Sequence, residues 1–248
     1  ARGAERKARM GMSISYSEDR FLGGRVILRQ PVAGFRAGLD AVMLAACIQA
    51  KDGEEILELG SGAGTASLCL AARVSGCNIT GVEIDPSLVE LANENAAANK
   101  MESRVHFIAG DALDPPKRDF AHVFANPPFH EGERSPDEAR ALALHDEGRL
   151  GDWLRAGLKR TRSDGTFTAI LRADRLGEAL NAVPHRGTEV IPLWPRQGEH
   201  AKRVILRVAK GARTRLAFRH GLVLHEKDGR YTPDAEAILR DGAPLACP

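Results

Sequence analysis

From residue 54 onward, short apolar runs alternate with longer segments in which apolar residues recur every three or four positions. A short apolar run between polar or turn residues is typical of a buried strand, and recurrence every ~3.6 residues is typical of a helix. We therefore predict strands at 55–59, 78–83, 105–109, 120–125 and 166–171, and helices at 63–74, 86–99, 150–161 and 175–182. Apolar strands that alternate with helices of this length indicate an α/β fold, with a parallel sheet and helices on both faces.

The chain on either side of this alternation follows other patterns. Residues 25–29, after Gly23-Gly24, predict a strand following a turn, and residues 39–50 have helical periodicity. Further strands are expected at 190–193 and 203–208, followed by a strand, a turn and a helix at 222–226, 228–229 and 233–240. We therefore expect an N-terminal arm and hairpin at 1–38, one α/β domain at 39–215, and a C-terminal strand–turn–helix appendage at 216–248 packed on the same domain.

Composition limits the class of protein. With 248 residues, 43% of them hydrophobic, the chain can form one large domain with appendages or two small domains. No apolar run approaches the ~20 residues of a membrane span. The four cysteines show no C-x-x-C spacing and no histidine in metal-ligand register, so we expect a reducing compartment and no metal. The basic start, 1–9, lacks the apolar segment of a signal peptide, so a flexible arm or cloning residues and a cytoplasmic location are expected.

Charge is unevenly distributed along the chain. Residues 194–219 carry eight basic residues against Glu199 alone, a balance of +7, so the rest of the chain carries −5 of the total of +2. Such a basic segment is either a solvated face or a surface for a polyanion, and its lack of acids favours the polyanion. The candidate contacts to a nucleic acid are Arg196, Lys202, Arg203, Arg207 and Lys210. Trp194 either anchors a strand or stacks on RNA.

A glycine-rich turn follows the first strand of the alternation. The sequence Ile56-Leu57-Glu58-Leu59-Gly60-Ser61-Gly62-Ala63-Gly64 has the pattern E-x-G-x-G-x-G and leads into a predicted helix. Glycines allow the backbone to approach a ligand closely. The dinucleotide pattern G-x-G-x-x-G would need a glycine at Thr65, so the turn indicates a nucleotide-like ligand without the pyrophosphate spacing.

Acidic side chains end the next two strands. Glu83 stands at the tip of the second strand, where a carboxylate can accept both hydroxyls of a ribose. Asp85 is expected to cap the helix that follows. Asp111, in Gly110-Asp111-Ala112, ends the third strand, where it can receive the amino group of a bound adenine. Asp40 either caps the helix at 39–50 or belongs to the site.

The fourth strand ends in Asn126-Pro127-Pro128-Phe129. Asn126 supplies a carbonyl acceptor beside an amide donor, and Pro127 has a carbonyl but no N–H. Two acceptors in a rigid turn, followed by the aromatic Phe129, suit a planar group that bears an –NH2. An ordinary Asn-Pro-Pro turn is the alternative. The charged loop 129–145 that follows is a candidate lid or substrate loop.

These motifs together resemble the class I S-adenosylmethionine-dependent methyltransferases that modify an exocyclic amino group through an Asn-Pro-Pro-aromatic motif. The resemblance covers roughly residues 56–171. Four flanking stretches are similar to the bacterial tRNA adenine-N(6) methyltransferases that act beside the anticodon of a valine tRNA: F-L-G-G-R-V-I-L-R-Q-P from Phe21, R-A-G-L-D-A-V-M-L-A from Arg36, A-K-R-V-I-L-R-V-A-K-G from Ala201, and Tyr231-Thr232.

The resemblance implies a Rossmann-like sheet of seven strands, S-adenosyl-L-methionine as cofactor, S-adenosyl-L-homocysteine as product, and RNA, most simply tRNA, as substrate. It implies that Glu58, Gly60 and Gly62 shape the cofactor pocket, that Glu83 binds the ribose, and that Asp111 and Ala112 lie at the cofactor adenine. Asn126 would border the cofactor and, with Pro127 and Phe129, act in catalysis. Transfer would be direct, by in-line displacement, with orientation and electrostatics as the main contributions.

Other acceptors and other classes remain open. The adenine-modifying members often carry Tyr where this chain has Phe129, and His130 is similar to a group that methylates the guanine amino group in ribosomal RNA. A protein glutamine amide and adenine in DNA are further acceptors for the same chemistry. A nicotinamide-dependent oxidoreductase is disfavoured by Thr65 and by Asn126-Pro127-Pro128. A catalytically dead RNA-binding protein is disfavoured by the presence of Glu83, Asp111 and Asn126.

Overall fold

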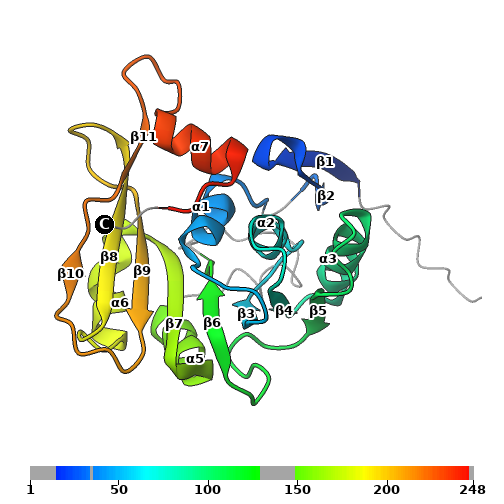
Figure 1. Ribbon diagram of the computed structural model, residues 1–248, viewed down its shortest axis with the longest axis horizontal. Coiled ribbons are helices and arrows are strands. Elements are labelled where there is room, and N and C mark those ends of the chain that lie inside the picture. The colour runs from blue at the N-terminus through cyan, green and yellow to red at the C-terminus, as the bar shows by residue number, and fades with distance from the viewer. Residues whose placement is uncertain (1–14, 34–35, 129–148, 246–248) are drawn as a thin grey trace, which may run out of the picture.

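Figure 1 shows the computed structural model, which describes residues 15–33, 36–128 and 149–245. At its centre is a nine-stranded sheet in the spatial order β10-β8-β9-β7-β6-β3-β4-β5, with β11 also paired to β8. The strands are β3 (Glu55–Leu59), β4 (Asn78–Glu83), β5 (Val105–Ala109), β6 (Phe120–Ala125), β7 (Thr161–Arg172), β8 (Thr188–Arg196), β9 (Arg203–Ala209), β10 (Ala217–Phe218) and β11 (Leu222–His225). Only β9 runs against its neighbours, β7 and β8, among the described pairings of this sheet.

Helices cover both faces of the sheet (Figure 1). Helices α1 (Leu39–Cys47), α2 (Thr65–Arg73), α3 (Pro86–Ala98) and α7 (Pro233–Asp241) bury their apolar residues in one core. Helices α5 (Leu150–Arg160) and α6 (Leu176–Ala182) bury theirs in the other, and the 3-10 turn η2 (Ala173–Arg175) leads into α6. The predicted α/β fold with helices on both faces is therefore confirmed.

The sheet is larger than the seven strands expected from the sequence. Seven of its strands follow the order β5-β4-β3-β6-β7-β9-β8, and the short β10 and β11 both pair in parallel with the outer edge of β8. Strand β7 also begins five residues before the predicted start, at Thr161. A shift in the pairing register between Phe120 and His122 of β6 lets the polar residues Arg162, Ser163 and Asp164 lie in β7 without becoming buried.

The order of the strands fixes the place of a ligand site. From β3 the chain moves outward through β4 to β5, then returns to place β6 on the other side of β3. Ligands of open parallel sheets bind at such a reversal, beyond the carboxyl ends of the strands. The reversal here lies between the ends of β3 and β6.

A separate hairpin lies beside helix α3. It consists of β1 (Tyr16–Phe21), the 3-10 turn η1 (Leu22–Gly24) and β2 (Val26–Pro31), with the two strands paired antiparallel. Asn99, the C-cap residue of α3, accepts from the Ile27 amide at 3.0 Å and donates to the Ile27 carbonyl at 2.6 Å. Asn95, one helical turn earlier, makes the same two bonds to Arg29, at 2.8 and 3.0 Å. Two asparagine side chains thus make the backbone hydrogen bonds that a second neighbouring strand would make with β2.

The C-terminal strand and helix are joined by a tightly held turn. Thr232 caps α7 by accepting from the Ala235 amide at 3.3 Å and donates its hydroxyl to the Val223 carbonyl of β11 at 2.7 Å. Pro233 occupies the first turn of α7, where its missing N–H is not needed. Helix α7 then packs on α1 and on the turn η1 of the hairpin.

Candidate functional site

The glycine-rich turn after β3 is bonded to the neighbouring strand β4. The amides of Gly60 and Ser61 donate to the Val82 carbonyl at 2.8 and 3.1 Å. Gly62 adopts φ +54°, and no heavy atom lies within 4 Å of the position that a Cβ would take. The inner side of the turn at Gly62 is therefore open, as a bound ligand would require.

Glu83 joins the tip of β4 to this turn. Its Oε2 accepts from the Gly62 amide at 2.8 Å, and its Oε1 accepts from the Asp85 amide at 3.1 Å. Each carboxylate oxygen has further acceptor capacity. Asp85 itself caps helix α3, since its Oδ1 accepts from the Ser87 amide at 2.8 Å, which confirms the predicted cap. Ile84, between the two acids, exposes 52% of its surface at the same edge.

Glu58 lies beneath the turn, in contact with helix α2. It is only 3% exposed, its Oε2 accepts from the Ser67 amide at 3.2 Å, and the Ser67 hydroxyl donates to the same oxygen. Burial raises the pKa of Glu58 to about 8, despite these bonds. Ser67 stands in the first turn of α2, whose Gly64 cap has no side chain to accept from it. Glu58 thus holds the helix that follows the glycine turn.

The third strand tip is more exposed. Asp111 accepts from the Leu113 amide at 2.8 Å and is an exposed residue, whereas Ala112 is buried. The Gly110 amide donates to the Glu83 backbone carbonyl at 2.9 Å, which holds the ends of β4 and β5 together. The structure thus brings Gly60, Gly62, Glu83 and Asp111 to one edge, as the sequence predicts.

Asn126 follows β6 at the strand reversal. Its Oδ1 is buried and has no hydrogen-bond partner among residues 15–33, 36–128 and 149–245. A buried acceptor left unpaired costs about 1–3 kcal/mol of stability. Such an atom therefore indicates a position where a ligand can supply the missing hydrogen-bond donor. Pro127, which follows, is buried. Phe129, the predicted stacking residue, and His130 lie outside the described residues, as does loop 131–145.

Trp153 of α5 is a residue at this edge that the sequence reasoning did not select. A Cβ built on Gly60 would lie 2.7 Å from the Trp153 ring, so the indole covers the glycine turn from the α5 side. The sequence feature that could have identified Trp153 is the presence of a tryptophan in the first turn of the helix after the Asn-Pro-Pro loop. Ser61, also unselected, has a buried hydroxyl without a partner in the part of the chain that the structure describes.

Asp40 does not cap helix α1, so that alternative is wrong. The cap residue is Gly38, and Asp40 instead pairs with Arg203, with 2.9 Å between Oδ2 and Nε. This pair joins α1 to the start of β9. Since β9 is antiparallel to β7, its start lies at the carboxyl edge, beside the end of β7.

Two of the five basic candidates pair with acids from outside the segment, Arg203 with Asp40 and Arg207 with Glu189. Arg207 is paired with Glu189 and only 15% of its side chain is exposed, while Arg196 pairs with Glu199 at 3.3 Å. The Lys210 ammonium donates to backbone carbonyls of Leu158 and Thr161, at 2.9 and 2.5 Å. Lys202 is exposed. Asp40 and Glu189 thus supply, from outside the segment, part of the negative charge that the segment itself lacks, and contact of the segment with RNA stays a prediction. Trp194 lies in β8 and donates to the His220 carbonyl at 3.2 Å, as a strand anchor would.

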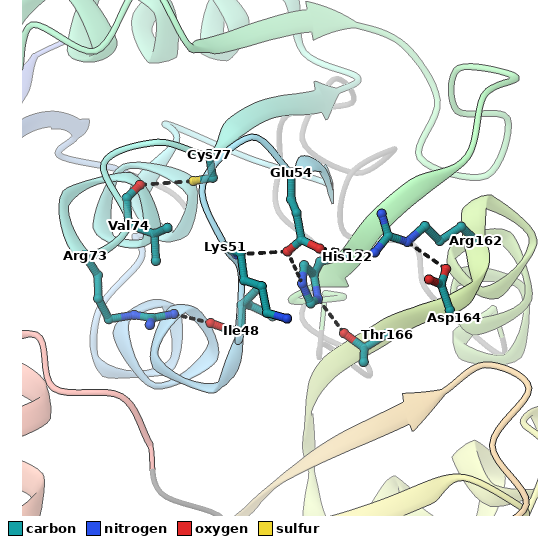
Figure 2. A network of polar contacts seen from close by, with 10 residues as sticks. All are labelled: Ile48, Lys51, Glu54, Arg73, Val74, Cys77, His122, Arg162, Asp164 and Thr166. Atoms are coloured by element: carbon teal, nitrogen blue, oxygen red, sulfur yellow. Dashed lines mark hydrogen bonds and ion pairs between the residues drawn. The ribbon is translucent and has the colours of Figure 1, made fainter.

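A second polar cluster lies at the opposite, amino edge of the sheet, where Figure 2 shows it. The His122 Nε2 lies 3.0 Å from Glu54 Oε2, and its Nδ1 lies 2.6 Å from the Thr166 hydroxyl. Since a carboxylate only accepts, Nε2 carries the proton and Nδ1 accepts from Thr166. Arg162 binds the other Glu54 oxygen at 3.1 Å. The cluster ties β3, β6 and β7 together far from Asn126.

Two classes of feature were not found within residues 15–33, 36–128 and 149–245. These ranges hold no group of three or more His, Cys, Asp or Glu side chains arranged to bind a metal ion. They also hold no helix long and apolar enough to cross a membrane.

Relatives of known function and fold match most of the chain. A family model described as the methyltransferase small domain matches residues 37–149. A tRNA1(Val) (adenine(37)-N6)-methyltransferase from Porphyromonas gingivalis is 30% identical over 230 residues, which cover 85% of this chain and 89% of that protein. The enzyme of the same name from Haemophilus influenzae is 28% identical over 222 residues, covering 86% of this chain and 94% of that protein.

Solved structures share the fold. A protein from Agrobacterium tumefaciens, described as a predicted O-methyltransferase, is 27% identical with a TM-score of 0.70, covering 84% of this chain and 98% of that one. A methyltransferase subunit of a type I restriction-modification system from Streptococcus thermophilus has a TM-score of 0.54 at 18% identity, covering 75% of this chain and 47% of that one. The chain belongs to the family of the tRNA1(Val) (adenine(37)-N6)-methyltransferases, which are S-adenosylmethionine-dependent methyltransferases.

Proposed function

We propose that this protein transfers a methyl group from S-adenosylmethionine to the exocyclic N6 of an adenine in tRNA, beside the anticodon. The observation that carries the proposal is the buried Oδ1 of Asn126 at the strand reversal, which no described residue pairs. The relatives named for adenine in tRNA favour that acceptor over guanine, a glutamine amide or DNA. The proposed substrate would place the enzyme in the cytoplasm.

The residues at the carboxyl edge fit the cofactor. Glu83, already fixed by two backbone amides, has free acceptor capacity for the hydroxyls of a ribose. Asp111 can accept from an adenine amino group, with the exposed Ile84 as an apolar face for the ring. The open side of Gly62 leaves room for the amino-acid part of the cofactor. When bound, S-adenosylmethionine supplies an electrophilic methyl group, and the proposed reaction involves no metal.

Asn126 and Pro127 would prepare the acceptor. An amine conjugated to its ring is a poor nucleophile, because its lone pair is delocalised. Hydrogen bonds from its two N–H groups to Asn126 Oδ1 and to the Pro127 carbonyl favour a more pyramidal nitrogen whose lone pair points away from the ring. Orientation and fixed dipoles are then the main catalytic contributions, and Phe129 would stack on the extruded base.

The test is transfer of labelled methyl into tRNA, ribosomal RNA, DNA and protein in parallel, followed by nucleoside mass spectrometry. We expect N6-methyladenosine in tRNA. Methylguanosine in ribosomal RNA would contradict the acceptor but leave the Asn126 chemistry intact. A protein that binds the cofactor and labels none of the four pools would contradict the proposed activity itself.

A variant tests the role of Asn126 within this reaction. Asn126→Ala should lower kcat by about 100-fold or more, because the amine loses its acceptor and its orientation. The cofactor Kd should stay within about threefold, because Glu83 and the glycine turn are unchanged. Asn181→Ala, at an exposed position of α6, is the matched control. A large loss of cofactor affinity in Asn126→Ala would place Asn126 at the cofactor rather than at the acceptor.

A further inference from the structure

A hollow lies beyond the end of β8, away from the candidate site. It is bounded on one side by residues 196–199, which follow β8, and on the other by residues 223–240, from β11 into α7. Its volume is about 1060 Å³. We call it the C-terminal groove. In Figure 1 the elements that border it, β8, β11 and α7, meet at the top of the molecule.

The C-terminal groove opens at the same edge of the sheet as Asn126. Strands β8 and β11 run parallel to each other, and both run in the direction of β6, because only β9 is reversed between them. Their last residues, Arg196 and His225, therefore lie at the edge where β6 delivers Asn126. Three strand spacings of ~4.8 Å separate β6 from β8, or roughly 14 Å. One extended substrate could cover both places.

An aromatic pair forms part of the groove. The rings of His225 and Tyr231 stack with centroids 4.7 Å apart and an angle of 23° between their planes. The backbone holds this pair in place, since the Glu226 amide donates to the Arg230 carbonyl at 2.8 Å and Thr232 caps α7. Tyr231 nevertheless exposes 37% of its surface. A rigid, partly exposed aromatic stack is a platform on which a further planar ring can stack.

The charges of the groove are balanced rather than basic. Cationic and anionic side chains line it in equal number, and Arg230, whose side chain is 83% exposed, pairs with Asp228 at 2.7 Å. Exposed ion pairs of this kind contribute about 0–1 kcal/mol and exchange partners readily. A balanced set of donors and acceptors suits the edge of a base, whereas a row of phosphates would require an excess of cations.

We infer that the C-terminal groove binds an unpaired base of the RNA substrate, stacked on the Tyr231–His225 pair, while another base occupies the site at Asn126. The inference rests on the proposed function for the identity of the substrate. It assigns the residues after β8 and β11 to substrate recognition, and the basic side chains of β9 are not required for it.

The test compares the affinity of tRNA for variants of Tyr231. Tyr231→Leu, which keeps apolar bulk but removes the ring, should raise the tRNA Kd by about 5- to 100-fold, the range for loss of one stacked base. Tyr231→Phe should stay within about threefold of the wild type. Phe218→Leu is the matched control, because Phe218 is 63% exposed on β10 beside the opposite end of β8. An unchanged Kd in Tyr231→Leu would overturn the inference.

Salt dependence separates a base from a phosphate in the groove. Loss of a base contact shifts log Kd by the same amount at every salt concentration, whereas loss of a phosphate contact also lowers the slope against log salt. We expect an unchanged slope in Tyr231→Leu. A reduced slope would overturn the assignment of the groove to a base.

Two further measurements keep this test independent of folding and of the proposed function. Ultraviolet crosslinking of wild-type protein to tRNA should give peptide adducts at Tyr231 or His225, and adducts confined to other regions would overturn the inference. If the wild type binds tRNA but forms no methyladenosine, the proposed function fails while the affinities still decide the groove. A wild type that does not bind tRNA would overturn both.

Discussion

At the scale of single residues, Glu58 shows how a buried acid supports the site through its protonation state. The pKa of Glu58 is raised to about 8 by burial, whereas the unfolded value is 4.5. The folded protein therefore keeps a proton that the unfolded chain releases above pH 4.5, and this cost to stability grows as the pH rises toward 8. Glu58→Gln cannot ionise, yet it keeps an oxygen that can accept from Ser67.

We therefore expect Glu58→Gln to stabilise the cofactor-free protein at pH 7.5, by on the order of 2–4 kcal/mol, at ~1.4 kcal/mol per pH unit. The gain should shrink toward zero near pH 4.5. Urea unfolding between pH 5 and pH 8 measures it, with Glu55→Gln as control, because the Glu55 side chain is 44% exposed on the same strand. A gain that does not vary with pH would mean that Glu58 ionises normally in the folded protein.

The residues of the site differ in how far the sequence could predict them. Gly60, Glu83, Asp111 and Asn126 each stand at the end of a strand or within two residues after it, so a correct strand assignment brings them to one edge without knowledge of tertiary contacts. The contact between Trp153 and Gly60 depends on how α5 packs over the turn. The pair Asp40–Arg203 joins residues 163 positions apart, and a local pattern carries no information on it.

At the scale of elements, the two asparagines of α3 couple the hairpin to the cofactor turn. Asn95 and Asn99 stand four residues apart on one helix face and bond alternate residues of β2, which likewise lie on one side of a strand. Asn95 also donates to the Ala63 carbonyl of the glycine turn, at 3.0 Å. The Asn99 amide instead makes its second bond within the helix, to the Asn95 carbonyl at 2.8 Å, so only Asn95 links β2 to the glycine turn, which provides a matched pair of variants.

Asn99→Ala should release β2, so that the Ile27 amide exchanges hydrogen faster, with a loss of about 1–3 kcal/mol in stability. Asn95→Ala should have the same effect at Arg29 and should also raise the KM for S-adenosylmethionine, because the Ala63 carbonyl loses its donor. Hydrogen exchange and steady-state kinetics measure the two effects. Equal cofactor KM values in both variants would show that the bond to Ala63 does not position the turn.

Elements were predictable where an apolar run alone defines them. Strands β3, β4, β5 and β6 have the predicted bounds, because each is a short, largely apolar run that ends at a glycine, an acid or Asn126. The start of β7 was missed because Arg162, Ser163 and Asp164 are polar and remain in the strand through the irregular register with β6. Strand β10 has two residues, too few for any period to appear.

At the scale of the whole molecule, the position of a basic residue in the sequence does not show whether its charge is free on the surface or paired with an acid. The segment 194–219 carries +7, yet Arg207 and Arg219 both bind Glu189, which lies outside it. Paired and partly buried guanidinium groups contribute less to attracting a polyanion than free ones. Recognition of RNA is then better sought in shape and stacking, as in the C-terminal groove, than in a basic stripe.

The cluster at the amino edge of the sheet should set the response of the whole fold to acid. Burial lowers the pKa of His122 below 6.5, and hydrogen bonds from the Lys51 amide and His122, with the nearby charges, lower that of Glu54 below 4.5 against its burial. Both groups bind fewer protons in the folded than in the unfolded state. Their contribution to stability is therefore complete above pH ~6.5, and falls as protons bind the unfolded chain first.

We expect the free energy of unfolding to decrease from pH 7 toward pH 5, with His122 contributing at most ~1.4 kcal/mol per pH unit. His122→Asn should flatten this dependence, although it lowers stability at pH 7 by breaking the bonds between β3, β6 and β7. Urea unfolding at intervals of half a pH unit, with the exposed His185→Asn as control, separates the change in slope from the change in level. An unchanged slope in His122→Asn would mean that acid acts on the fold elsewhere, because a group that titrates differently in the two states must change the slope when it is removed.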